Sequence, residues 1–338
     1  LALCTADGTQ RLTYSGLAAW DAAGQPLACW MEPAEDAVVI RVDDRGASYP
    51  VTVDPFISTG LRVLVSSDTS MADDFSWSVA VSGDTALIGV PEDDNAGGVN
   101  AGSVHVFTRS AIGWAQQTQL IASDASALAH FGSAVALAGD TAVIGSRGAS
   151  HAGGSFAGLA YVFVRTGAGW TEQARLQASD ASSGAAFRYS VALSGERAVI
   201  GAYQDSTLAG FYAGTAYVFV RNGSAWSEEA KLLASDAAID AQFGTSVALS
   251  GDTALVGANL ADTNGKIHSG AAYVFVRNGS TWSEQARLLA SDASPHDSFG
   301  SSVALGDETA LVGAPWDEHD GTPGPAGSVY VFVPDGAK

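Results

Sequence analysis

The sequence contains an internal repeat of 56 residues, and this repeat constrains the fold more than any other feature. The positions that recur in phase are Phe75, Phe131, Phe187, Phe243 and Phe299; Trp114, Trp170, Trp226 and Trp282; Asp84, Asp140, Glu196, Asp252 and Glu308; and Gly102, Gly158, Gly214 and Gly270. Gly327 comes one residue late, so the last copy carries a single insertion. Strict repeats of this length are typical of solenoids, propellers and arrays.

Each copy divides into four short runs that read as β-strands. In the fourth copy they are TSVALSG, TALVGA, GAAYVFVRNG and TWSEQARLLASD, with tight hairpin turns at 250–253 and 278–280. No window keeps a period of 3.6 residues over the length of a helix. Four antiparallel strands in about 50 residues are typical of a propeller blade, because a solenoid has shorter rungs and a sandwich does not repeat so strictly. We predict an all-β propeller of four-stranded antiparallel blades built from five repeats.

Strand counting also predicts how the ring closes. The segment LRVLVSSDTSMADDF (61–75) matches ARLLASDASPHDSF (286–299), so it reads as a fourth strand without its own first three. The last copy contains the first three strands only. Five blades closed by this N-terminal strand would cover two sheet edges. A larger ring that uses residues 1–56 and an open piece of a longer array are the alternatives. The expected domains are an N-terminal β segment at 1–56 and the propeller at 57–338.

The residues kept in every copy have structural interpretations. Small residues dominate the first strand, which suits the crowded innermost position of a blade. The repeated Phe and Trp side chains are expected to pack between blades, because each buries a large apolar area. The aspartates of the ASDA sequences are expected to bind loop backbone amides; they are Asp124, Asp180, Asp236 and Asp292.

The stretch FGSSVALGDETALVGAP (299–315) resembles the FG-GAP repeat, best known from the β-propeller head of integrin α-subunits. FGTSVALSGDTALVGAN is especially similar to repeats of large secreted or surface-attached bacterial FG-GAP proteins. The resemblance covers about residues 57–334 and implies a propeller, and residues 1–56 resemble the all-β lead-in of such repeats. The family often carries a D-x-D-x-D-G calcium loop between the first two strands. Here the turns are SGDT, AGDT, SGER, SGDT and GDET, so calcium is not carried over to these positions. No cofactor is assigned, and calcium bound by other carboxylates is the alternative.

Charge and cysteine content limit the partners and the compartment. The formal net charge is −20, which repels phosphate backbones and anionic lipid, so we expect no nucleic acid partner. No apolar run is long enough to cross a membrane, so no membrane insertion is expected. Cys4 and Cys29 fit either a disulfide formed outside the cytoplasm or two buried thiols. With the family resemblance, this predicts an extracellular or cell-surface location.

Candidate ligand-binding residues lie in the variable loops. Loops alternate between the two faces of a propeller, so the second-to-third-strand loops and the blade-to-blade loops share one face, here called the long-loop face; the hairpin turns form the tight-turn face. Variable loops on a rigid scaffold are a common place for binding. The candidates are Trp316, Asp317, Glu318, Asp320, Tyr203, Tyr212, Trp77 and Tyr189. Candidate metal ligands are Asp317, Glu318, Asp320, Asp93 and Asp94, with a solvated acidic turn as the alternative.

No nucleophile elbow, HExxH or Walker sequence is present, and no catalytic residue is assigned. We therefore expect a non-enzymatic extracellular binding or adhesion module that recognises a protein or glycan partner through the long-loop face. One alternative is a carbohydrate-active hydrolase or lyase that uses loop carboxylates. Another is a structural unit that self-associates by pairing edge strands between chains.

Overall fold

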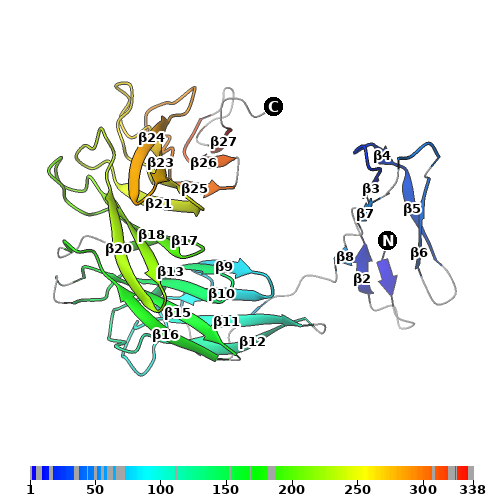
Figure 1. The fold of residues 1–338 in the computed structure, drawn as a ribbon, viewed down its shortest axis with the longest axis horizontal. Helices are drawn as coiled ribbons and strands as arrows, with labels where there is room; N and C mark the ends of the chain where they lie inside the picture. The colour runs from blue at the N-terminus through cyan, green and yellow to red at the C-terminus, as the bar shows by residue number, and fades with distance from the viewer. Residues whose placement is uncertain are drawn as a thin grey trace. The chain divides into compact units, whose positions relative to one another are not determined.

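The computed structural model (Figure 1) describes residues 2–4, 10–14, 18–33, 38–43, 45–48, 52–54, 57–58, 64–65, 73–110, 113–151, 154, 156–167, 169–181, 187–306, 309–318, 324 and 326–333. Every regular element among these residues is a β-strand. They include no helix long and apolar enough to cross a membrane. The chain divides into two compact units, Leu1–Leu64 and Val65–Lys338.

The first unit consists of small antiparallel sheets with strand orders β1-β2-β8, β4-β3-β7 and β5-β6. Its strands are β1 (Ala2–Cys4), β2 (Gln10–Tyr14), β3 (Ala18–Trp20), β4 (Pro26–Leu27), β5 (Cys29–Pro33), β6 (Val38–Val42), β7 (Thr52–Asp54) and β8 (Ile57–Ser58). The carboxylate of Asp21 accepts backbone N–H groups from Ser48, Gln25 and Ala23, and these bonds lower the pKa of Asp21. The unit includes β8, which the sequence assigned to the propeller.

The second unit contains five blades. Blade 1 has β9 (Ser78–Ser82), β10 (Thr85–Val90), β11 (Ser103–Ser110) and β12 (Gly113–Leu120); blade 2 has β13 (Phe131–Ala138), β14 (Thr141–Ser146), β15 (Leu159–Thr166) and β16 (Gly169–Leu176); blade 3 has β17 (Phe187–Ser194), β18 (Arg197–Ala202), β19 (Thr215–Asn222) and β20 (Ala225–Leu232). Blade 4 has β21 (Phe243–Ser250), β22 (Thr253–Ala258), β23 (Ala271–Asn278) and β24 (Thr281–Leu288); blade 5 has β25 (Ser302–Leu305), β26 (Ala310–Ala314) and β27 (Ser328–Phe332).

Each blade is an antiparallel sheet whose strands follow chain order. The blades follow one another around a common centre, and neighbouring blades touch through their first strands in the order β9, β13, β17, β21, β25. The small residues of the first strand allow this close approach. The prediction of an all-β propeller built from five repeats is therefore confirmed.

At three of the described blade boundaries, the glycine after the repeated Phe lies against the second-strand glycine of the preceding blade. A Cβ added to Gly257 would lie only 2.0 Å from the carbonyl oxygen of Gly300 in the next blade. The Ser246 hydroxyl donates to the same oxygen at 2.7 Å, and Gly300 holds a φ of 92°, which favours glycine. The same contact joins Gly89 to Gly132 and Gly201 to Gly244. The motif therefore sets how closely one blade packs against the next.

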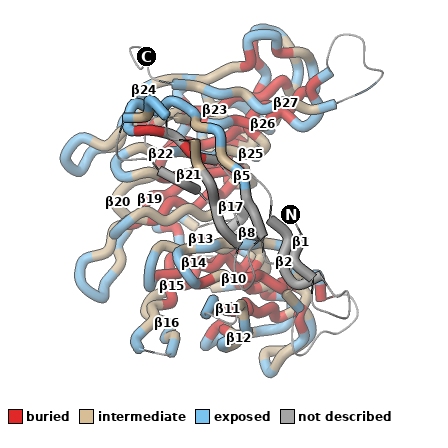
Figure 2. Tube along the Cα trace, turned by 90° about the vertical axis from the view of Figure 1, so that its right-hand side faces the viewer, coloured by how far each residue is buried: buried red, intermediate tan, exposed pale blue. Residues whose placement is uncertain are grey.

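The repeated aromatic residues pack between blades as predicted. Phe243 is fully buried and makes edge-on contacts with Tyr273 and Phe275 of its own blade, at 5.4 and 5.9 Å between ring centroids. The same hydrophobic cluster contains Val218 of the preceding blade, and Trp282 packs against it. In Figure 2 the buried residues run along the blade strands, while the exposed residues lie mainly in turns and loops.

The ASDA aspartates are structural, but their principal partners differ from those expected. Asp180 accepts the hydroxyl of Tyr217 at 2.7 Å and the ammonium of Lys231 at 2.6 Å, both in the following blade. Equivalent tyrosine hydroxyls bind Asp124, Asp236 and Asp292. Burial, together with the carboxylate partner, raises the pKa of Tyr217. These carboxylates tie consecutive blades together through side chains, where the sequence predicted bonds to loop amides.

The predicted closing strand falls largely outside the described residues, which omit 59–63 and 66–72. Ile57–Ser58 form β8, which pairs with β2 in the first unit. Four blades show all four strands, whereas blade 5 shows three. Among the described residues β27 pairs with β26 alone, and its side chains Val329 and Val331 are exposed.

Candidate functional site

The long-loop face is built on a repeated backbone ladder between neighbouring loops. At the boundary of blades 1 and 2, Leu128 N–H donates to Val99 O at 2.8 Å, and His130 N–H donates to Asn100 O at 3.0 Å. The corresponding donor–acceptor pairs at the next described boundaries are Asp240–Phe211, Gln242–Tyr212, His296–Ile267 and Ser298–His268. Several of these non-glycine residues hold positive φ, a conformation that persists only where the surroundings fix it. The loops are therefore held in defined positions.

In several loops, a side-chain oxygen accepts a hydrogen bond from a backbone N–H of the same loop. Asp94 Oδ1 accepts the N–H of Asn100 at 2.8 Å, and Asp262 Oδ1 accepts the N–H of His268 at 2.8 Å. Ser150 makes the equivalent bond in blade 2. Asp94, a candidate metal ligand, thus has a structural task in its own loop.

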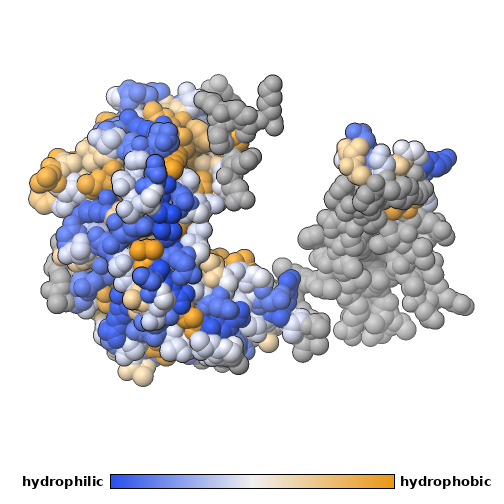
Figure 3. All heavy atoms as spheres, in the orientation of Figure 1, coloured by the Kyte–Doolittle hydropathy of each residue, from blue (hydrophilic) through white to orange (hydrophobic). Residues whose placement is uncertain are grey.

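Large apolar side chains project from these fixed loops into solvent. One loop position carries Val99, Phe211 and Ile267 in blades 1, 3 and 4, with 59, 74 and 55 % of each residue exposed. Other exposed apolar residues of the same loops are Leu128, Phe156, Leu208, Tyr212 and Ile239. Figure 3 shows apolar atoms gathered at the left edge of the propeller, over loops that Figure 1 draws in green to yellow. Large exposed apolar patches are typical of interaction surfaces in soluble proteins.

Exposed carboxylates lie among these apolar side chains. They belong to Asp94, Asp240, Asp262 and Glu318. Within the described part of the chain, no lysine or arginine lies at ion-pair distance from any of the four. The long-loop face therefore presents negative charge that its own side chains do not neutralise.

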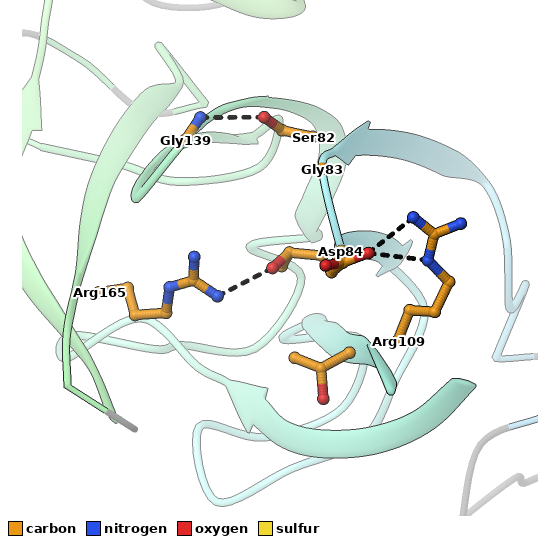
Figure 4. Close-up of a pocket in the computed structure, with 8 residues that line it drawn as sticks. Ser82, Gly83, Asp84, Arg109, Gly139 and Arg165 are labelled. Atoms are coloured by element: carbon orange, nitrogen blue, oxygen red, sulfur yellow. Dashed lines mark hydrogen bonds and ion pairs between the residues drawn. The ribbon is translucent and has the colours of Figure 1, made fainter. Parts of the chain in front are cut away.

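The tight-turn face differs because its acids are paired. Asp84 and Arg109 lie 2.7 Å apart, and Asp252 and Arg277 lie 2.6 Å apart. Arg165 pairs with Asp140 and also donates to Thr85 of the preceding blade at 2.9 Å. Figure 4 shows Asp84, Arg109 and Arg165 among the residues around a hollow of about 430 Å³. The described acids of these short turns therefore each have an arginine partner.

Four of the predicted ligand-binding residues are exposed on the long-loop face. Trp316 and Trp77 are 60 and 53 % exposed, Tyr212 is also exposed, and Glu318 points to solvent. Tyr203 is partly buried. Tyr189 lies in β17, but its side chain is outside the described ones, and Asp320 is outside the described residues altogether.

The structure buries two of the predicted acids. Asp317 is 3 % exposed, and its Oδ2 accepts the hydroxyl of Tyr330 at 3.0 Å. Asp93 is also buried and accepts the side-chain amide of Gln119 at 2.9 Å. Both occupy the repeat position that Asp205 fills in blade 3, where the carboxylate accepts from Thr215. These carboxylates brace the start of their loops and are not part of the surface open to a partner.

Trp77 belongs to a polar cluster that the sequence did not reveal. The guanidinium of Arg147 stacks over its ring at 5.4 Å from the centroid. Glu92 lies 2.5 Å from Arg147 and 3.2 Å from His130, and it also accepts a bond from Asn100. The available signal was a break in the repeat, since the residues equivalent to Arg147 are Pro91, Tyr203, Asn259 and Pro315. This cluster fixes an exposed indole at the boundary of blades 1 and 2.

The described acidic candidates Asp93, Asp94, Asp317 and Glu318 are not gathered into one group. Among the described residues, no group of three or more His, Cys, Asp or Glu side chains is placed to hold an ion. Asp297 is buried, and its Oδ1 has no hydrogen-bond partner among the described atoms. Burial raises the pKa of Asp297, and the nearby charges of Asp317 and Asp292 add to the effect. Cys29 is partly buried in β5 and the side chain of Cys4 lies outside the described ones, so the disulfide stays a prediction.

A family comparison matches this architecture. The FG-GAP repeat model matches residues 61–107, 114–163, 170–219, 226–275 and 282–332. The chain belongs to the FG-GAP repeat family. The last four matched segments each run from the fourth strand of one blade to the third strand of the next, so an FG-GAP repeat spans a blade boundary. The chain has no match among curated proteins.

Proposed function

We propose that this FG-GAP propeller is a non-enzymatic extracellular binding module that recognises a protein partner through its long-loop face. The observation that carries the proposal is the combination of exposed apolar side chains with carboxylates that have no ion-pair partner among the described residues, on loops held by backbone ladders. Rigid loops lower the entropy cost of binding, because they are already ordered before the partner arrives.

The chemistry of the face favours a partner surface that carries basic and apolar side chains together. At the boundary of blades 3 and 4, Asp240 follows the exposed Ile239, and its N–H donates to the carbonyl oxygen of the exposed Phe211. In blade 4, Asp262 shares a loop with Ile267. Lysine or arginine side chains of a partner would complement the carboxylates and speed association. An anionic partner would meet like charge.

A selection experiment tests the proposal and shows what chemistry the face binds. A displayed library of random peptides is selected on the immobilised full chain, and each enriched peptide is then measured against variants. We expect enriched peptides to combine basic and apolar residues and to lose about tenfold in affinity on Phe211→Ser or on Asp240→Asn. Asparagine tolerates the positive φ of 59° at position 240, so the second variant removes the charge and keeps the loop.

Asp84→Asn on the tight-turn face is the matched control, since it removes the same charge from the opposite face. Peptides that bind all three variants as well as the parent chain would contradict a role for the long-loop face.

A further inference from the structure

Two histidines lie side by side on neighbouring loops of the long-loop face. His268 belongs to the loop between β22 and β23, and His296 belongs to the loop between β24 and β25 (Figure 1). Their imidazole rings are in edge-on contact, with 5.4 Å between the ring centroids and 77° between the ring planes. His296 is exposed to solvent and His268 is half-buried. The pair is therefore accessible to a small ligand from solution.

The backbone ladder fixes the two residues relative to each other. The N–H of His296 donates to Ile267 O at 2.9 Å, and the N–H of Ser298 donates to His268 O at 3.2 Å. Asp262 Oδ1 accepts the N–H of His268 at 2.8 Å. The two loops are thus held together before any ligand arrives, which lowers the entropy cost of bringing two side chains to one ion.

The propeller scaffold does not require imidazole rings at these positions. In the repeat, the corresponding pairs at two earlier boundaries are Asn100 with Leu128 and Tyr212 with Asp240. The same backbone ladder forms at both of those boundaries. Two histidines come together at one blade boundary only, so the structural task of the loops does not explain them.

The ring nitrogens of His268 and His296 have no hydrogen-bond or ion-pair partner within the described part of the chain. Other histidines differ in this respect. His105 is buried, and both of its ring nitrogens face glutamine amides. His130 Nδ1 lies 3.2 Å from Glu92. A neutral imidazole offers one ring nitrogen to a metal ion, and this pair keeps both of its acceptor nitrogens for that purpose.

The separation of the two rings suits a shared metal ion. Two imidazoles that bind one tetrahedral zinc ion through bonds of about 2.0–2.1 Å have ring centres about 5 Å apart. The observed separation of 5.4 Å is close to this value, so binding requires the rings to rotate while their loops stay in place. The exposed carboxylate of Asp262 in the same loop adds negative charge, which attracts a cation.

We propose that His268 and His296 form a binding site for a divalent transition-metal ion that prefers imidazole ligands, such as Zn²⁺. Water fills the remaining coordination positions on the solvent side. Imidazole nitrogen suits zinc, copper and nickel, whereas calcium and magnesium prefer oxygen ligands. Metal binding at this pair needs no partner protein, so the proposal stands or falls separately from the proposed function.

Isothermal titration calorimetry of the full chain with zinc chloride tests the site at neutral pH. We expect one zinc ion per chain with a Kd of about 10 µM, weaker than for sites with three or four protein ligands. Excess calcium should leave the zinc affinity unchanged, because calcium selects carboxylate and carbonyl oxygens.

Protein variants locate the site. His268→Asn and His296→Asn should each weaken zinc binding at least about tenfold, because each removes one of the two ligands. Asparagine tolerates the positive φ of 51° and 70° at these positions, and Asn100 is the native residue at the position equivalent to His268. His130→Asn is the matched control, since it removes an imidazole held by Glu92 at a φ of 52° and should leave the zinc affinity unchanged.

Nuclear magnetic resonance of the histidine ring nitrogens gives a second measurement on the unmodified chain. Zinc should shift the signals that disappear in His268→Asn and His296→Asn. Four results would each overturn the proposal: no zinc binding up to about 1 mM, unchanged affinity in both variants, an equal loss in His130→Asn, or displacement of zinc by calcium. Circular dichroism checks that each variant is folded.

Discussion

Replacing the glycine of the second strand by alanine tests whether the FG-GAP motif acts at blade boundaries. At Gly257 the new methyl group would lie 2.0 Å from the backbone oxygen of Gly300. At the equivalent Gly313 of blade 5, the nearest atom is the hydroxyl oxygen of Ser302 at 2.4 Å, and no atom of a following blade is among its close neighbours in the described part of the chain. The same substitution therefore meets backbone at one site and a rotatable side chain at the other.

The expected costs differ accordingly. In Gly257→Ala, blade 5 must move about 1 Å away, which costs about 2 kcal/mol in packing. The buried bond from Ser246 to Gly300, 2.7 Å long, is lost as well and adds about 1 kcal/mol. In Gly313→Ala, the exposed Ser302 rotates away, so the cost stays below about 1 kcal/mol.

Urea unfolding of the full chain measures both free energies, and thermal unfolding should show a loss of about 6 °C for Gly257→Ala. Gly201→Ala, whose Cβ would also lie 2.0 Å from a backbone oxygen of the next blade, serves as a second site of the severe class. Equal losses at Gly257 and Gly313 would refute the reasoning, because they would mean that the clash with the next blade does not set the cost.

Four further substitutions have definite expected outcomes. Tyr217→Phe should lower the free energy of unfolding in urea by about 2 kcal/mol, and Tyr161→Phe by about 1 kcal/mol. The difference is expected because the Tyr217 hydroxyl also lies 3.1 Å from the buried Asp205, whereas the Tyr161 hydroxyl bonds Asp124 alone among the described side chains. Similar losses in the two variants would contradict this reasoning. Asp297→Asn should raise stability by about 1 kcal/mol at pH 7, since the raised pKa means that ionised Asp297 destabilises the fold. That gain should vanish below about pH 4, where the parent carboxyl is protonated, and a gain independent of pH would count against it. Asp84→Asn should change stability by less than about 0.5 kcal/mol, because its ion pair with Arg109 is exposed.

The sequence predicted the scaffold well because each scaffold residue repeats in phase. Phe243 and Trp282 recur at 56 residues, and both pack in one inter-blade cluster. Their role follows from the period alone, because a large apolar residue that recurs once per blade is expected to pack at the boundary between two blades. The bonding partner of Asp180 was not predictable in this way, because Tyr217 reaches it only after the next blade has folded against it.

The candidate site was harder to predict because burial separates residues that are adjacent in the sequence. Asp317 and Glu318 read as one acidic cluster, yet Asp317 turns inward to Tyr330 while Glu318 stays in solvent. The pair of Glu92 and Arg147 was missed for the opposite reason. These residues are far apart in the chain, and only the seating of blade 2 on blade 1 brings them to 2.5 Å.

The backbone ladders and the exposed side chains of the long-loop face use different atoms of the same loops, so stability and the proposed recognition depend on different groups. The ladder between Val99 and Leu128 uses backbone N–H and carbonyl groups, and the equivalent ladder at Phe211 and Asp240 is the same although the side chains differ. A side chain at position 99, 211 or 267 points into solvent and contributes little to the ladder. Substitution of Phe211 should therefore leave the free energy of unfolding within about 0.5 kcal/mol of the parent value. A loss of binding in that variant would then report the side chain itself, because the loop that presents it is held by its backbone.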